Sequence, residues 1–510
     1  MKPSVKPSVK PDLPTASIDP ADVQGLVRFA HARMTEACYL TLRIRDAAAA
    51  RAWCAAAPVT TSEIREHPPE VALQVAFTSA GLRSLGVPGD VVAGFSAEFL
   101  SGMAGEESRS RRLGDIGANA PEEWLWGGPG NIPDVLVMLF AKPGKLGEWK
   151  RTVQDGAWDA AFELMQCLDT SDLDGYEPFG FKDGISQPEM DWDGKRDVDS
   201  PQIAYGNLVA AGEFLLGYPN EYGKYTDRPL VDSANARAAD LPAAADAPTK
   251  KDVGRNGTYL VLRVLEQDVR GFWKFLDSLT DSNPVARQQL AESMVGRTIE
   301  GQPLAQSEDG QNRFTFDDDP AGTRCPLGAH IRRANPRNTD YPNRPAGVLT
   351  RLWSMLGFAS KGIRADLMSA TRFHRILRRG REYGPGLTVE QAVQSAAGHQ
   401  GEDQADDAKR GLRFICLNAN IARQFEFVQS AWLMSTKFDG LSGESDPLMG
   451  NRAAIGDGHA TGNFTIPREK GLRRCVTGLP QFVMVRGGAY FFLPGIRALR
   501  YFSKAGESGR

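Results

Sequence analysis

The feature that most constrains this fold is a set of short apolar runs arranged in two successive groups. The runs are rich in β-branched and aromatic residues and are bounded by Gly, Pro or Asp, which is typical of β-strands. They cover residues 38–44, 72–77 and 135–140 in the first group, and 258–264, 413–418, 481–485 and 489–493 in the second. We therefore expect two sets of strands, one in each half of the chain.

Helical patterns accompany these strands. Residues 268–279, 389–397 and 422–433 carry apolar side chains at the i, i+3 and i+4 spacing of one helix face. Strands interleaved with helices in two successive sets predict an α+β pair, of the kind that an ancient duplication would produce.

The chain is long enough for more than one domain. We expect two domains in its 510 residues, because paired domains of about 200–250 residues are common. Residues 232–251 are rich in Ala and Asp and nearly free of large apolar side chains, which predicts a linker or a long loop. The expected order is a disordered tail at 1–19, a domain at 20–231, a linker at 232–255 and a domain at 256–505.

Charge and hydropathy exclude several classes of protein. A net charge of −3 and a pI near 6.2 argue against a generally basic nucleic-acid binder. No stretch approaches about 18 uninterrupted apolar residues, so a membrane span is not expected. The N-terminus, rich in Pro and Lys, lacks the apolar core of a secretory signal. We therefore expect a cytoplasmic protein without nucleic-acid or membrane partners; no feature assigns an oligomeric state.

The six cysteines are widely spaced and include no C-x-x-C pair. This spacing argues against a disulfide scaffold, a cysteine zinc site and a covalently attached haem. We expect reduced, buried thiols at Cys38, Cys54, Cys167, Cys325, Cys416 and Cys475.

One of the six histidines stands out by its context. His330 follows the small residues Gly328 and Ala329 and precedes three arginines within seven positions. Small neighbours allow a large flat ligand to approach, and arginines offer forked donors to carboxylates, so the segment is a reasonable half-site for haem b. A basic loop with a chance histidine explains this segment alone equally well. No H-E-x-x-H motif is present, so a zinc hydrolase has no ligand set.

A second segment, Phe179-Gly-Phe-Lys-Asp183-Gly-Ile-Ser-Gln-Pro188, places an acid among turn-forming residues. An Asp-Gly pair by itself usually marks a turn. The segment becomes more informative when it is combined with His330.

The two segments, with a third, resemble the dye-decolorising peroxidase family. Gly180-Phe-Lys-Asp183-Gly184 resembles the G-x-x-D-G signature, and Gly-Ala-His330-Ile-Arg-Arg-Ala-Asn-Pro-Arg337 resembles the proximal-histidine motif. His374-Arg-Ile-Leu-Arg378-Arg-Gly-Arg-Glu-Tyr-Gly384 resembles the distal-arginine motif. The three occur in family order over most of the chain, and its length is similar to that of the larger, advanced bacterial and fungal-like branch.

The resemblance implies a fold, a cofactor and an activity. The fold would be α+β, with two ferredoxin-like domains that each pair an antiparallel sheet with peripheral helices. Haem b would be held non-covalently, mainly by the C-terminal domain. The activity would be reduction of hydrogen peroxide with oxidation of bulky aromatic substrates, such as dyes and phenols, through ferryl intermediates.

The resemblance also implies residue roles. His330 would be the axial iron ligand, Asp183 the acid–base group on the opposite face, and Arg378 the charge stabiliser beside it. Arg379 adjoins Arg378 and is an alternative for the distal arginine. Arg337 would anchor a propionate. Further contacts with haem would come from Gly184, Ile185, Ser186, Leu412 and Phe414.

Two roles are less closely defined by the motifs. Asp446 fits best as the carboxylate that accepts the Nδ1 proton of His330, with Glu426 and Glu444 as rivals. Trp353 and Tyr383 lie in the motif-bearing region and are candidate electron relays, although an ordinary core role fits both.

The residue set also predicts a pH range and separates rival functions. Arg378 should lower the pKa of Asp183 while burial raises it, and we expect an activity optimum at about pH 4–5. A haem carrier or sensor without turnover is the main alternative, but it would not need Asp183 and Arg378 together. An unrelated hydrolase would need a nucleophile elbow, and no G-x-S-x-G motif is present.

Overall fold

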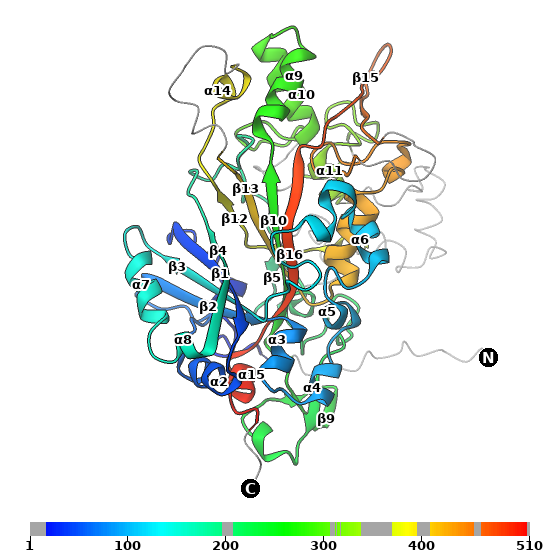
Figure 1. Cartoon of the computed structure of the whole chain (residues 1–510). Coiled ribbons are helices and arrows are strands. Elements are labelled where there is room, and N and C mark those ends of the chain that lie inside the picture. Colours follow the sequence, from blue (N-terminus) through cyan, green and yellow to red (C-terminus); the bar gives the residue numbers. More distant parts are fainter. Residues whose placement is uncertain are drawn as a thin grey trace, which may run out of the picture.

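The computed structural model describes residues 17–195, 208–305, 312, 314–316, 318–337, 370–394, 408–452 and 461–506. Most of the predicted N-terminal tail and the relay candidate Trp353 lie outside these residues. The centre of the molecule is a nine-stranded sheet with strand order β11-β13-β10-β16-β2-β3-β1-β4, in which β12 also pairs with β13 (Figure 1).

Four strands of the N-terminal half form one end of this sheet. They are β1 (Glu36–Ile44), β2 (Val71–Phe77), β3 (Val135–Ala141) and β4 (Phe162–Asp169). All are antiparallel to their neighbours in the order β2-β3-β1-β4. The helices α2 (Ala47–Ala56), α7 (Leu146–Val153) and α8 (Trp158–Ala161) pack beside them (Figure 1).

The C-terminal half supplies the other end of the sheet. Its strands are β10 (Thr258–Gln267), β11 (Leu377–Arg378), β12 (Arg381–Tyr383), β13 (Gly411–Asn418) and β16 (Val483–Leu493). In the first half the strand order runs second, third, first and fourth, which is the order of a ferredoxin-like unit. The second half has the same order when β11 and β12, which both pair with β13, count as one strand. This repeat confirms the predicted α+β fold with two ferredoxin-like sets of strands.

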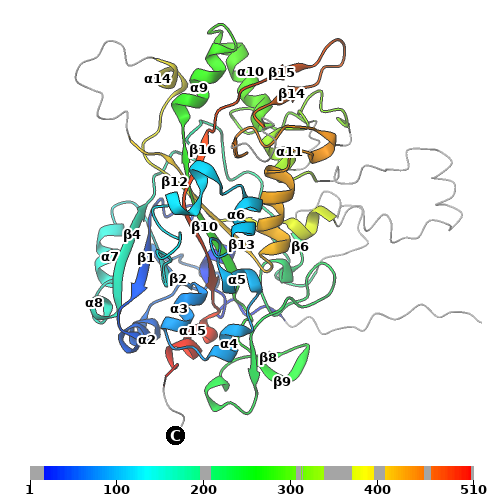
Figure 2. The same cartoon turned by 45° about the vertical axis from the view of Figure 1, so that its right-hand side comes forward.

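Helices and short strands surround the central sheet. The remaining α-helices are α1 (Gly25–Arg28), α3 (Ser79–Ser84), α4 (Gly89–Ala93), α5 (Ala97–Ser101), α6 (Glu107–Leu113), α9 (Val269–Ser278), α10 (Pro284–Val295), α11 (His330–Ala334), α14 (Val389–Val393) and α15 (Ile496–Ser503). The short strands are β5 (Glu189–Met190), β6 (Leu208–Val209), β14 (Phe464–Ile466) and β15 (Arg474–Val476). Two π-helical segments, Ala422–Glu426 and Val428–Leu433, run alongside β10 and β13 toward α11 (Figure 2). No helix in the described ranges is long and apolar enough to cross a bilayer.

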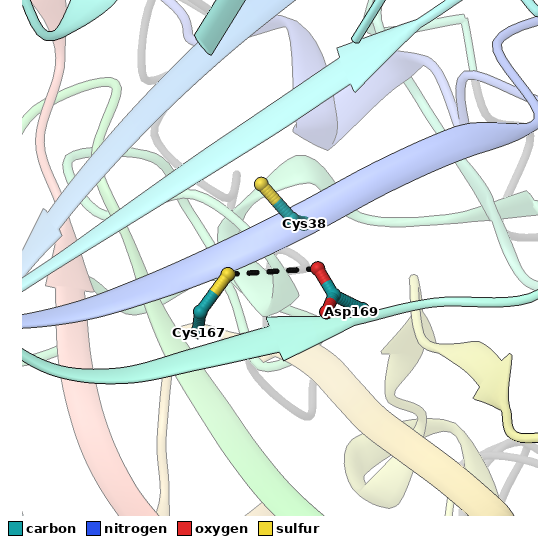
Figure 3. Close-up of side chains that lie close together, drawn as sticks. All are labelled: Cys38, Cys167 and Asp169. Carbon is teal, nitrogen blue, oxygen red and sulfur yellow. Dashed lines mark hydrogen bonds between the residues drawn. The ribbon is translucent and has the colours of Figure 1, made fainter. Parts of the chain in front are cut away.

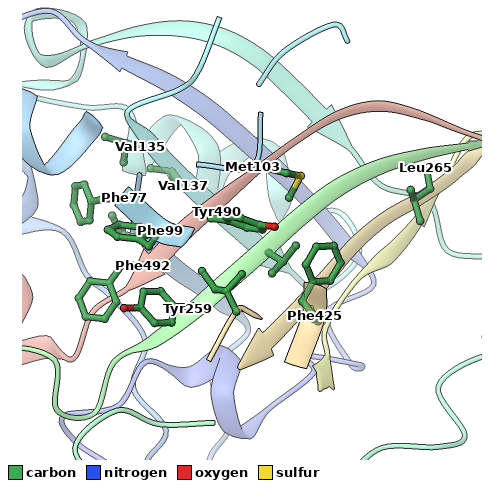
Figure 4. Packing of buried hydrophobic residues seen from close by; sticks show 14 of the residues in the cluster. Phe77, Phe99, Met103, Val135, Val137, Tyr259, Leu265, Phe425, Tyr490 and Phe492 are labelled. Carbon is green, nitrogen blue, oxygen red and sulfur yellow. The ribbon is translucent and has the colours of Figure 1, made fainter. Parts of the chain in front are cut away.

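The two ends of the sheet meet where β16 pairs with β2, through Phe492 and Phe77. Aromatic side chains from both halves pack around this junction, including Phe99 and Tyr259 (Figure 4). All four are 1% exposed or less. Burial of one such side chain contributes about 1.5–3 kcal/mol, so the junction is a substantial part of the core.

The structure differs from the predicted strands in several places. The runs 481–485 and 489–493 belong to one strand, β16, which continues through Gly487 and Gly488. The register of β16 against β10 shifts between Val485 and Gly487, so Arg486 is an extra residue in a β-bulge. Strand β4 was not predicted, because polar residues interrupt its apolar pattern and it lies at the edge of the sheet.

The segment predicted as a linker contains regular structure. The strands β7 (Leu230–Asp232), β8 (Ala243–Ala244) and β9 (Ala247–Asp252) form a small antiparallel sheet. The buried Arg228 guanidinium contacts Asp246 and donates from Nε to Asp252 at 2.6 Å. Ion pairs thus help to order a segment that is poor in large apolar residues, and its role as a linker between two domains stays a prediction. The domain limits 20–231 and 256–505 remain a prediction.

Candidate active site

A cavity of about 290 Å³ opens where the C-terminal strands meet the loop that precedes β5. Most of its wall is apolar, and a few charged side chains face inward. Such a cavity with few, convergent polar groups is typical of a ligand or active site. Apolar lining residues include Ile185, Leu412, Phe414, Val428 and Leu448.

His330 begins helix α11 and lines one wall of this cavity. Its Nδ1 lies 2.9 Å from Oδ2 of Asp446, a fully buried carboxylate. The other oxygen, Oδ1, accepts hydrogen bonds from the backbone N–H groups of Leu448 and Met449 at 2.9 and 2.8 Å. The imidazole is thus held by Nδ1, and Nε2 is the ring nitrogen left for a ligand.

The charges of this pair reinforce each other. Burial acts to raise the pKa of Asp446, but the neighbouring His330 and the Met449 N–H outweigh it, so the pKa lies below its usual range. Burial likewise acts to lower the pKa of His330, and the Asp446 carboxylate reverses this effect. The geometry favours a proton on Nδ1 that is shared with the carboxylate.

The two rival carboxylates have other partners. Glu426 contacts Arg109 Nε at 2.8 Å and accepts a hydrogen bond from the Tyr490 hydroxyl at 3.0 Å. Glu444 accepts a hydrogen bond from the backbone N–H of Thr465 at 2.9 Å. Of the three carboxylates considered from the sequence, only Asp446 is bonded to the His330 ring in the described part of the chain.

Asp183 and Arg378 also line the cavity and form an ion pair. Arg378 Nη1 donates to Asp183 Oδ1 at 3.1 Å, and Nη2 donates to the Ser186 carbonyl at 3.3 Å. The backbone N–H of Arg378 donates to Gln187 Oε1 at 3.0 Å. These bonds join β11 to the Asp183 loop, in which Gly184 adopts the left-handed conformation at φ +75°.

The pKa of Asp183 reflects opposing effects. Burial raises it, whereas the Arg378 charge, a backbone hydrogen bond from Gly184 and the more distant His330 lower it. The net result is a pKa below the usual range, so this carboxyl is ionised at neutral pH.

Arg379 directly follows β11 and turns away from the cavity. Its guanidinium donates to the carbonyl oxygens of Leu26 and Val27 at 2.7 and 2.9 Å. Arg378 therefore faces the cavity, whereas Arg379 holds the N-terminal segment.

Arg337 lines the cavity from the loop after α11, in the left-handed conformation at φ +57°. Its Nη1 donates to the carbonyl oxygens of Asn312 and Phe314, each at 3.1 Å, and its guanidinium lies 3.8 Å from the Phe314 ring. Burial lowers the pKa of Arg337 to about 9. Two further arginines, Arg297 and Arg375, line the same cavity and were not singled out from the sequence.

Glu177 is another cavity residue that the sequence analysis missed. Its carboxylate accepts the backbone N–H groups of Phe179 and Phe181 at 3.1 and 3.0 Å, and the Gln267 amide at 2.8 Å. Burial raises the pKa of Glu177 to about 7. The Glu177 side chain holds the start of the loop that carries Asp183. Glu177 lies six residues before Asp183, and no sequence pattern around it indicates this role.

The other predicted residues divide into two groups. Ile185, Ser186, Leu412 and Phe414 line the cavity, and their contact with haem stays a prediction. Tyr383 is buried, and the Arg413 guanidinium carbon lies 3.7 Å from the centre of the Tyr383 ring. Tyr383 is not among the described residues that line the cavity.

The donor set fits a haem. An imidazole held through Nδ1 lines a mostly apolar cavity, and guanidinium groups that suit carboxylates line the same cavity. An acid and an arginine complete the wall, a combination suited to proton transfer and charge stabilisation rather than to storage alone.

Comparisons with known proteins find peroxidases of similar sequence and fold. No protein-family model matches the chain. The chain is 27% identical over 466 residues to the dye-decolorizing peroxidase msp1 of Mycetinis scorodonius, covering 85% of this chain and 76% of the relative. It is 27% identical over 450 residues to the multifunctional dye peroxidase DyP2 of Amycolatopsis sp., covering 84% of this chain and 81% of the relative.

Solved structures share the fold at lower sequence identity. A fungal DyP-type peroxidase from Auricularia auricula-judae matches with a TM-score of 0.67 and 23% identity, covering 96% of this chain and all (100%) of that chain. A DyP-type peroxidase of Anabaena sp. matches with a TM-score of 0.67 and 21% identity, covering 94% of each chain.

The fold and the site together define the class of this protein as a peroxidase. Within that class, the chain is similar to dye-decolorising peroxidases over most of its length, which is the family that its three motifs resemble.

Proposed function

We propose that this chain is a haem b peroxidase that reduces hydrogen peroxide and oxidises bulky aromatic compounds, including dyes and phenols. The observation that carries the proposal is the Asp183–Arg378 pair, which shares one cavity with His330. Relatives named as dye peroxidases and a solved dye-decolorizing peroxidase in complex with 2,6-dimethoxyphenol support this substrate class.

Haem b would be held without a covalent link. His330 would bind the iron through Nε2, with its Nδ1 proton held by Asp446. Arg337, Arg297 and Arg375 are the cations that could receive the propionates. When bound, the haem supplies an iron that binds peroxide and stores the oxidising equivalents released when the O–O bond breaks.

Asp183 would move a proton of hydrogen peroxide. Its Oδ1 is occupied by Arg378, and the carboxyl is ionised at neutral pH, so it could accept a proton from the peroxide and return it to the departing oxygen. This return of the proton would make water the leaving group instead of hydroxide.

Arg378 would stabilise the charge that develops on the departing oxygen. A guanidinium stays protonated and therefore makes a poor base but a good fixed cation. Its bonds to Ser186 and Gln187 hold it in place before the reaction, so little reorganisation is needed.

The aromatic substrate would be oxidised near the cavity or through an aromatic relay. Tyr383 remains a candidate, because Arg413 lies over its ring and the residue belongs to β12 beside the cavity strand β13. Trp353 remains a candidate from the sequence alone.

The proposed location is the cytoplasm. All six cysteines are free thiols, which is typical of a reducing compartment.

The test is turnover by the haem-loaded protein. We expect hydrogen-peroxide-dependent oxidation of an anthraquinone dye and of 2,6-dimethoxyphenol, and its loss in Asp183→Asn but not in Asp193→Asn, which removes an exposed acid from the same segment. A protein that binds haem yet oxidises neither compound faster than free haem would instead be a carrier or sensor.

A further inference from the structure

A cluster of reactive side chains lies away from the cavity, between β1 and the edge strand β4. The Sγ atoms of Cys38 and Cys167 and a carboxylate oxygen of Asp169 all lie within 4.8 Å of one another (Figure 3). Lys150, from α7, places its Nζ 3.3 Å from Cys167 Sγ. None of the four lines the cavity described above.

The strand register explains why these residues meet. Cys38 pairs with Asp169 and Leu40 pairs with Cys167 across β1 and β4, so the two thiols are diagonal neighbours on one face of the sheet. A β-bulge follows at Thr41 and Leu42. Strand β4 is the last of the sheet, and an edge strand can shift more easily than a central one.

The surroundings of Cys167 favour its thiolate. A hydrogen bond with Cys38 and the ammonium of Lys150 lower the pKa of Cys167 to about 7, against the opposing effects of burial and Asp169. The hydrogen bond with Cys167, burial and the charge of the Cys167 thiolate raise the pKa of Cys38, which remains a thiol. At neutral pH one sulfur is therefore a nucleophile and its neighbour carries the proton.

The other described cysteines provide a comparison within the same chain. Burial raises the pKa of Cys54 and of Cys325 to about 12. Cys475 is exposed and Cys167 is half-buried, so the expectation of buried thiols was wrong for these two. Cys167 combines partial access with a cationic neighbour, which is the environment of an oxidisable thiol.

We propose that Cys167 and Cys38 form a peroxide-reactive pair, in which Cys167 is oxidised first and Cys38 then closes a disulfide. This modification site is separate from the haem reaction and uses only hydrogen peroxide, the oxidant that the proposed function also consumes.

The proposed oxidation of Cys167 and Cys38 takes place in two steps. The Cys167 thiolate attacks one peroxide oxygen, an S–O bond forms as the O–O bond breaks, and the departing hydroxide takes a proton to become water. The Cys38 sulfur then loses its proton and attacks Cys167, so that an S–S bond forms while the S–O bond breaks and a second water leaves. Two thiols are oxidised by two electrons, and one hydrogen peroxide is reduced to two waters.

A metal site fits the cluster less well. Structural zinc sites have four ligands, whereas the described residues here offer three. The Lys150 ammonium beside Cys167 would also repel a divalent cation, although it stabilises a thiolate. The cation therefore favours oxidation chemistry over metal binding.

Peptide mapping of the haem-loaded protein after treatment with hydrogen peroxide tests the proposal. We expect a Cys38–Cys167 disulfide that dithiothreitol reverses. In Cys38→Ser, the disulfide should be absent and dimedone should label Cys167 as the sulfenic acid. If Cys167 stays reduced while the more exposed Cys475 is oxidised, the proposal is wrong.

The charge variants give a second readout. Alkylation of Cys167 by iodoacetamide at pH 7 should slow roughly tenfold in Lys150→Met, as the thiol pKa returns toward about 8.5. It should accelerate in Asp169→Asn, and Lys142→Met should leave it unchanged, since that lysine pairs with Glu70. Equal rates in all variants would overturn the proposal, as would one tightly bound Zn²⁺ per chain that is lost in Cys38→Ser.

Discussion

His330 and Asp446 lie 116 residues apart in the chain, yet Nδ1 of one is 2.9 Å from Oδ2 of the other. The carboxylate is fully buried and is also fixed by two backbone N–H groups. The chain's own residues thus orient the imidazole, and this orientation is open to direct tests.

Asp446→Asn should weaken the site without unfolding it. An amide keeps the shape but accepts the Nδ1 proton less strongly, and the loss of such a partner typically costs about 10–100-fold in metal affinity or activity. Haem retention and the rate of reaction with peroxide measure the effect. Glu444→Gln is the matched control, because that acid bonds to Thr465; equal losses in both variants would contradict a special role for Asp446.

Asp183→Asn should retain haem and lose the peroxide reaction. Removal of a general acid–base group typically costs about 10²–10⁴-fold in rate. Stopped-flow absorption after mixing with hydrogen peroxide measures the step directly. Wild-type speed in the variant would show that another group moves the proton.

Arg378→Leu should raise the pH below which the rate of the peroxide reaction falls. In the wild type the pKa of Asp183 is below its usual range, so the base is lost only as the pH falls through that low value. Without the arginine, the opposing effect of burial is less well compensated and the pKa rises. The rate constant for the peroxide reaction, measured between pH 3 and pH 8, should therefore fall at a higher pH.

A second effect of this substitution is a lower plateau, since the fixed cation is gone. Loss of one such stabilising group typically costs about 10²–10³-fold. Arg378→Lys should restore part of the rate. If a variant keeps both the wild-type maximal rate constant and the wild-type pH at which the rate falls, Arg378 has no part in the reaction.

The strands that the sequence predicts well are those with uninterrupted apolar runs. β1, β3 and β10 are such strands, and their observed ends differ little from the predicted ones. The sequence did not predict β4, because an edge strand needs fewer apolar residues and so lacks a continuous apolar run. The short strands within residues 232–251 could not be predicted, because buried ion pairs, which leave no periodic signal, help to order them.

The motifs predicted the chemistry of the site but not its full wall. His330, Asp183 and Arg378 lie within recognisable segments, and they line one cavity. Glu177 and Arg297 reach that cavity through tertiary packing, from segments without a pattern of their own. The Cys38–Cys167 pair was missed for a similar reason, because strand pairing joins residues that are far apart in the sequence.

The wall of the cavity also depends on a buried ion pair. Arg263 on β10 lines the cavity and pairs with Asp115, and both side chains are almost fully buried. Asp115→Ala would leave a buried charge without its partner, so we expect the free energy of unfolding to fall by about 3–5 kcal/mol. Chemical denaturation measures it, and breaking the exposed Arg111–Glu107 pair with Glu107→Ala should cost less than about 1 kcal/mol. Similar costs for the two variants would contradict this account.

The absorption spectrum of haem-loaded His330→Ala, recorded with and without added imidazole, tests the central claim most directly. If Nε2 of His330 binds the iron, the variant should hold haem poorly or show a shifted Soret band, and imidazole should restore the wild-type spectrum. A variant that keeps the wild-type spectrum without imidazole would show that the iron ligand is another residue.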